Sequence, residues 1–132
     1  MASPNFRFVA PPAALDGITP GWAIEMLRDG EIALVVDDGG LAAIDATAHA
    51  LDLVTVQVVR TEADQGAQER TVIAYATRLP TIWCAPSFTD GTKEWARKRG
   101  PMTLLVEIDG PLPEEERRRI ERFVAILGRQ SE

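Results

Sequence analysis

The run Glu31-Ile-Ala-Leu-Val-Val-Asp-Asp-Gly-Gly40 says most about the fold class of this chain. A short continuous apolar segment rich in Val and Ile is typical of a strand buried on both faces. Beyond it, apolar residues recur at helical spacing. These residues are Leu41, Ile44, Ala48 and Leu51. A strand therefore passes into a helix through two carboxylates and two glycines, and in open α/β sheets ligands bind at such carboxyl ends of strands.

The composition is that of an ordinary globular protein. Of 132 residues, 45% are apolar and 26% are charged, and the formal net charge is −6. This acidic balance disfavours nucleic acid and anionic membranes as partners, since both require a basic surface. The single cysteine, Cys84, excludes an internal disulfide and a multi-cysteine metal site. Because the chain also lacks a membrane-length apolar run and a signal-peptide pattern, we expect a cytoplasmic protein.

The chain is expected to form one α/β domain over residues 17–132, preceded by a flexible arm over residues 1–16. Three prolines and little periodicity indicate the arm. Phe6 and Phe8 alternate with polar or small residues, so an alternative is that the arm pairs with the edge of a sheet.

Within the domain, helices and strands follow from periodicity and end signals. Thr19 is expected to cap the first helix, with Pro20 at its first position, and Asp38 to cap the second. The polar segment 61–70 is expected to be a mobile hairpin loop, and Pro80–Pro86 an irregular bridge. The other expected elements are strands over 31–37, 53–59, 71–77 and 102–108, and helices over 40–51, from Thr89 to Arg99, and from Pro113 onward.

These elements predict the α/β class. The first strand–helix–strand unit is expected to be a parallel crossover and the next pair of strands antiparallel. The fold would then be a two-layer sandwich with a mixed, about four-stranded sheet packed by helices.

The acidic turn is the first candidate ligand site. Asp37 and Asp38, with Gly39 and Gly40, have the chemistry to hold a divalent metal or a phosphate compound at the strand end. A structural alternative is that Asp38 only caps the helix while Asp37 is solvated. No metal cluster and no resident cofactor are expected.

Other polar residues give weaker indications of a site. Asp90 and Lys93 lie at a helix start that can bind an anion, although Asp90 as a plain helix cap is the favoured explanation. His49 and Cys84 are the only His and Cys, and a catalytic pair is disfavoured because His49 belongs to a helix and Cys84 is surrounded by apolar residues.

The sequence around the acidic turn resembles short stretches of two protein families. Val35-Val-Asp-Asp38 followed by a helix is similar to the opening of response-regulator receiver domains, whose acidic pair binds Mg²⁺ beside a phosphorylated Asp, but Thr81–Cys84 lacks that Asp. The longer stretch Ala23–Asp38 resembles the first helix and strand of dihydroxybutanone-phosphate synthases, but the following loop lacks that family's metal-binding acids. Both resemblances are read as shared local geometry, and no family is assigned.

The absence of a complete catalytic pattern favours a binding or assembly module that acts through protein–protein contacts. Trp83, Phe6 and Phe8 are the predicted interface residues, and a homo-oligomer is the expected assembly. The alternative is a small enzyme or ligand-binding domain that uses Asp37 and Asp38. The sequence leaves open whether the protein is an enzyme.

Overall fold

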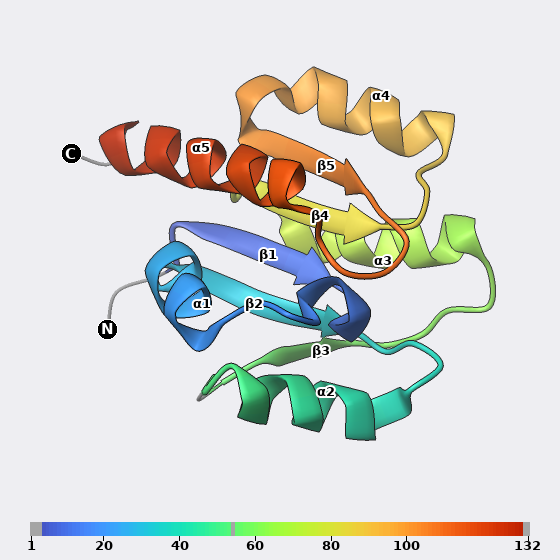
Figure 1. The fold of residues 1–132 in the computed structure, drawn as a ribbon. Coiled ribbons are helices and arrows are strands. Elements are labelled where there is room, and N and C mark those ends of the chain that lie inside the picture. Colours follow the sequence, from blue (N-terminus) through green and yellow to red (C-terminus); the bar gives the residue numbers. More distant parts are fainter. Residues whose placement is uncertain (1–3, 54, 131–132) are drawn as a thin grey trace.

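A computed structural model describes residues 4–53 and 55–130 of the chain. Its centre is a sheet of five parallel strands in the order β3-β2-β1-β4-β5 (Figure 1). The strands are β1 (Phe6–Ala10), β2 (Gly30–Val35), β3 (Gln57–Val59), β4 (Thr81–Ala85) and β5 (Thr103–Glu107). The α helices are α1 (Pro20–Leu27), α2 (Gly40–Ala50), α3 (Gln65–Ala76), α4 (Asp90–Arg99) and α5 (Glu114–Gln130), with 3-10 turns η1 (Pro12–Leu15) and η2 (Gly100–Met102).

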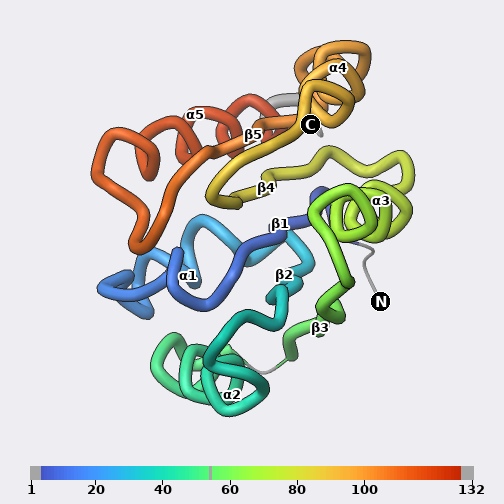
Figure 2. The backbone as a smooth tube through the Cα atoms, turned by 90° about the vertical axis from the view of Figure 1, so that its right-hand side faces the viewer, coloured from blue at the N-terminus to red at the C-terminus, as the bar shows by residue number. Residues whose placement is uncertain are grey.

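Helices cover both faces of the sheet (Figure 2). One core cluster joins the sheet to α1, α2 and α5, and the other joins the opposite face to α3 and α4. The α/β class predicted from the sequence is confirmed. The sheet itself is five-stranded and wholly parallel, where a mixed sheet of about four strands was expected, and helices pack on two faces rather than one.

The largest difference from expectation is the central strand β1. Phe8 pairs with Ile32 of β2 on one side and with Ile82 of β4 on the other, and its side chain is fully buried. Residues 6–10 are therefore the middle of the sheet rather than part of a flexible arm; residues 1–3 of that expected arm lie outside the described part of the chain. The neighbouring prolines, read as signs of disorder, instead end the strand and open η1.

Helix α3 replaces the expected mobile loop and the strand after it. Asp64 caps the helix by accepting a hydrogen bond from the backbone amide of Ala67, at 2.8 Å. The buried face of α3 consists of Glu69, Val72 and Ala76, which recur at helical spacing. Because one of these three residues is charged, the apolar stripe was too weak to read from the sequence, and the β-branched residues after Arg70 favoured a strand.

Strand β4 was expected to be an irregular bridge between prolines. It pairs with β1 and β5, and four of its five residues are buried. Pro80 and Pro86 flank the strand and occupy no position within it, so they interrupt no hydrogen bond of the ladder. The strand predicted over 53–59 is shorter than expected, since among the described residues of that range β3 covers Gln57–Val59; residue 54 lies outside the described part of the chain.

Other predicted elements are confirmed. The side chain of Thr19 caps α1 by accepting from the amide of Trp22 at 3.1 Å, with Pro20 in the first turn. Helices α2, α4 and α5 and strands β2 and β5 form close to the positions expected. Among the residues described, none of the helices has both the length and the apolar content that crossing a membrane requires.

Candidate functional site

A cleft of about 540 Å³ lies at the carboxyl ends of the strands. The loops after β1, β2, β4 and β5 and the first half of α3 form its walls. The chain moves outward from β1 to β2 and β3, then crosses back through α3 to β4, so the strand order reverses between β1 and β4. Parallel α/β sheets bind ligands in the crevice at such a switch point. The acidic turn that the sequence offered as a candidate site lies at this edge of the sheet.

The turn after β2 forms one wall of the cleft and contains Asp37, Asp38 and Gly39. The carboxylate of Asp37 accepts a hydrogen bond from the amide of Gly39 at 2.9 Å, and its carbonyl accepts from Gly40. Gly40 has a φ of +66°, a conformation that glycine adopts without strain. The expected cap by Asp38 is wrong: Gly39 occupies the cap position, no side chain caps the helix there, and Asp38 is exposed.

Helix α3 supplies the opposite wall through Gln65, Gln68, Glu69 and Val72. The amide nitrogen of the Gln65 side chain donates to Ser87 Oγ at 3.0 Å, which ties α3 to the loop after β4. Gln68 accepts from the backbone amide of Glu62 at 3.0 Å and thereby fixes the approach to the helix. None of these residues was predicted as part of a site, because α3 itself was missed.

Glu69 is a buried carboxylate at the edge of the cleft. It accepts hydrogen bonds from the Thr89 amide at 2.9 Å, from the Thr92 hydroxyl at 2.6 Å and from the Thr89 hydroxyl. Burial by itself would raise the pKa of Glu69, but the hydrogen bonds from Thr89 and Thr92 oppose it, and the pKa is held below its ordinary value. Glu69 thus remains charged and fastens the N-terminus of α4 to α3.

The end of β4 forms the floor of the cleft through Trp83, Cys84 and Ala85. Trp83 packs edge-on against Phe88, with ring centroids 5.0 Å apart, and is only 3% exposed. Burial raises the pKa of the Cys84 thiol to about 12, which keeps it protonated and unreactive at neutral pH. His49 lies exposed in the last turn of α2 and is not among the residues that line the cleft.

A second acidic turn follows β5 and completes the cleft with Ile108, Asp109 and Gly110. Asp109 is exposed, and Gly110 has a φ of +102°. The sequence signal was present, since an apolar strand followed by Asp-Gly repeats the pattern after β2. It was read only as a turn because the neighbouring strands were unknown.

The remaining predicted residues lie away from the cleft or in the core. Asp90 and Lys93 are exposed on α4 outside the residues that line the cleft, and Lys93 pairs with Glu107 at 3.3 Å. Asp90 is the first helical residue, while the cap is Thr89. Trp83, Phe6 and Phe8 are buried, so they cannot provide the contact surface predicted for them.

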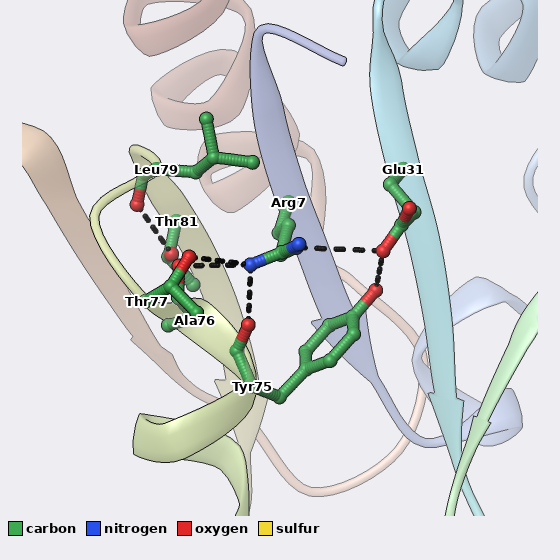
Figure 3. Close-up of polar contacts among 7 residues, drawn as sticks. All are labelled: Arg7, Glu31, Tyr75, Ala76, Thr77, Leu79 and Thr81. Carbon is green, nitrogen blue, oxygen red and sulfur yellow. Dashed lines mark hydrogen bonds and ion pairs between the residues drawn. The ribbon is translucent and has the colours of Figure 1, made fainter. Parts of the chain in front are cut away.

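The opposite edge of the sheet holds a different polar cluster (Figure 3). Arg7 donates to the Ala76 carbonyl at 3.1 Å and to the Thr77 hydroxyl at 2.8 Å, and thus caps the C-terminus of α3. Its Nε lies 3.4 Å from Glu31, which also accepts from the Tyr75 hydroxyl, and its guanidinium stacks on the Tyr75 ring. Burial, and then the contact with Glu31, raise the pKa of Tyr75. These groups supply hydrogen-bond partners and opposite charge to one another.

Strand order and cleft together define a doubly wound parallel α/β domain with a ligand-sized cleft at its switch point. Compared with known proteins, the chain matches no family model, no curated protein and no solved structure. The cleft is therefore the feature of the molecule that bears on its function.

Proposed function

We propose that this protein binds a small organic molecule in the cleft at the carboxyl edge of its sheet. The observation that supports this proposal is the cleft's position and size together. Its volume of about 540 Å³ lies within the range typical of small-molecule sites. It also lies where the strand order reverses, the place at which sheets of this topology take their ligands.

The lining combines an apolar floor with a few polar groups. Val35, Ala85 and Ile108, which are partly exposed, provide apolar surface, while the turns after β2 and β5 contribute carboxylates. Such a mixture supports orientation of a bound molecule, with apolar contact supplying affinity and polar groups supplying specificity. We place the protein in a reducing cytoplasm, which its one free thiol, Cys84, supports.

A matched pair of variants at Ser87 tests the proposal. Ser87 is exposed and lines the cleft, so Ser87→Trp would fill the cleft, while Ser87→Ala only removes the hydroxyl that Gln65 contacts. The probe is a library of neutral aromatic fragments, followed by ligand-observed NMR. We expect fragments that bind the natural chain to keep binding S87A and to lose binding to S87W.

Equal binding to both Ser87 variants would place the fragments elsewhere on the molecule and contradict the proposal. A melting temperature for each variant, measured without fragment, ensures that loss of binding by S87W does not come from unfolding.

Contact with another protein is a second proposal, and the edge strand β3 supports it. Within the described part of the chain, β3 pairs with β2 on one side and has no strand on the other, and Val58 in its middle is 51% exposed. An edge strand with an exposed apolar residue favours pairing with another chain, and a second copy is the simplest partner. Light scattering is expected to give twice the chain mass, reduced by Val58→Lys; a monomer at all concentrations would contradict this second proposal.

A further inference from the structure

We propose that the molecule bound in the cleft is an organic cation with an apolar body, such as an aromatic amine. This inference rests on the proposed function, because it concerns the ligand of that same cleft. It specifies the charge that the cleft selects, and it excludes phosphate compounds, which sheets of this topology often bind at the same place.

The first observation is the charge of the cleft. Among the described residues that line it, every group charged at neutral pH is a carboxylate. These are Asp37, Asp38, Glu69 and Asp109. No Lys or Arg of the described part of the chain is among the residues that line the cleft. A concave site lined by charges of one sign concentrates field lines and attracts the opposite charge.

The second observation concerns the helix N-termini beside the cleft. Such N-termini bind phosphate when their amides are free. Here α3 and α4 have side-chain acceptors at their N-termini, whereas at α2 the acceptor serves only the Gly39 amide before the helix and no side chain caps the helix itself. Asp37 accepts from Gly39 before α2, and Asp64 accepts from Ala67 in α3. Glu69 accepts from Thr89 at the start of α4. A phosphate would have to displace these groups at α3 and α4, and at α2 it would be repelled by the carboxylates of the preceding turn.

The four carboxylates are not equivalent. Glu69 is buried, and its hydrogen bonds to Thr89 and Thr92 occupy it. Asp37 uses one oxygen on the Gly39 amide. Asp38 and Asp109 are exposed, and no side-chain partner is found for either among the residues described. The charge that meets a ligand therefore belongs chiefly to the two turns after β2 and β5.

The apolar part of the ligand is expected to lie against the floor of the cleft. Val35 ends β2, Ala85 ends β4 and Ile108 follows β5, and all three line the cleft and are partly exposed. A ring resting on this floor would hold a short aminoalkyl chain toward the acidic turns. A compact metal ion would leave the apolar floor uncovered, so an organic cation suits the whole cleft better.

Three indoles that share a two-carbon side chain and differ in its terminal group test this inference: tryptamine (cationic), tryptophol (neutral) and indole-3-propionate (anionic). Isothermal titration calorimetry on the full chain measures each dissociation constant. We expect tryptamine to bind about tenfold tighter than tryptophol and indole-3-propionate to bind weakest, since a charge near exposed carboxylates is partly screened. The advantage of tryptamine is expected to shrink as salt is added.

A double variant assigns the charge preference to residues. Asp38→Asn with Asp109→Asn keeps the shape of both turns and removes two charges from the cleft. The matched control, Asp45→Asn with Asp90→Asn, removes two exposed charges outside the lining residues. We expect the cleft variant to lose most of the preference for tryptamine while its affinity for tryptophol is unchanged, and the control variant to keep the preference.

The outcomes separate this inference from the proposed function. Tryptophol that binds in the cleft as tightly as tryptamine, or tighter binding of indole-3-propionate, would overturn the charge preference and leave the cleft as a binding site. An equal loss of preference in the control variant would show that overall charge is responsible and would overturn the assignment to the cleft. Failure of all three indoles to bind would count against the cleft itself and therefore against both proposals.

Discussion

The two edges of the sheet use polar residues in opposite ways. At the amino edge, Arg7, Glu31 and Tyr75 contact one another and the end of α3 (Figure 3). At the carboxyl edge, Asp38 and Asp109 are exposed beside a cleft. A polar cluster that satisfies itself holds elements together, whereas carboxylates left facing solvent retain the ability to bind something else.

Glu69 shows that the role of a polar residue depends on its hydrogen-bond partners and not only on the edge of the sheet where it lies. It lies at the carboxyl edge and lines the cleft, yet it is buried and holds the start of α4. Its role is thus closer to that of Arg7, which holds the end of the same helix α3. Glu69 ties the first half of α3 to the start of α4, Arg7 fixes the end of α3, and the function proposed for the cleft depends on the wall that they position.

The largest expected effect is that of Glu69→Ala. Removing this carboxylate leaves the Thr89 amide and two threonine hydroxyls without their acceptor in a buried place, so the free energy of unfolding is expected to fall by about 3 kcal/mol. Urea unfolding at neutral pH measures the change. Glu25→Ala, on the exposed face of α1, is the control and is expected to cost less than about 0.5 kcal/mol. Equal losses of unfolding free energy in the two variants would contradict the stabilising role given to Glu69.

Arg7→Ala is expected to cost about 2 kcal/mol, because it uncaps the last carbonyls of α3 and leaves Glu31 without its cation. The same unfolding experiment applies, with Arg28→Ala as the matched control, since Arg28 is largely exposed and lies 3.8 Å from Asp29. A fragment that binds the cleft should bind R7A with unchanged affinity wherever the variant is folded. Loss of that affinity would contradict the separation of the two edges.

Stability is expected to depend on pH through Glu69. Its pKa in the folded chain is held below the ordinary value of 4.5, so its contribution is present above that value and is lost as the pH falls through the lower, folded pKa. Unfolding midpoints measured from neutral to acidic pH should therefore fall more steeply for the natural chain than for Glu69→Gln. Parallel curves would show that Glu69 does not contribute to the acid transition.

The smallest expected effects are those of the acidic turn. Asp37→Ala removes the acceptor of the Gly39 amide and is expected to cost about 0.5–1 kcal/mol. Asp38→Ala removes an exposed side chain that caps nothing and is expected to cost less than about 0.5 kcal/mol. Thermal melts of both variants rank the two residues. The reverse order would restore Asp38 as the helix cap that the sequence indicated.

Local signals predicted much of the fold correctly. The strand after Glu31, the helix capped by Thr19 and the acid-rich start of α5 each contain their own start or end signal, and all three form as expected. The missed elements depend on partners distant in the chain. β1 and β4 pair with each other across more than seventy residues, for example Phe8 with Ile82, and both are flanked by prolines that concealed them.

The candidate site was predicted in part for the same reason. Asp37, Asp38 and Gly39 line the cleft as expected, because the rule for strand ends is local. Glu69 and Ser87 were missed since their place depends on α3 and β4, which the sequence did not reveal. A site assembled from several strand ends requires the strand order, and a single sequence contains no direct signal for that order.

Backbone amide NMR of the chain titrated with tryptophol tests most directly the claim that ligands bind at the carboxyl edge. Chemical-shift changes are expected to concentrate on the turns after β2 and β5 and on Ala85–Ser87, where the cleft lies. The amides of Glu31 and Tyr75 at the amino edge should not move. Changes centred on those amides or on β3, or no changes at all, would contradict the claim.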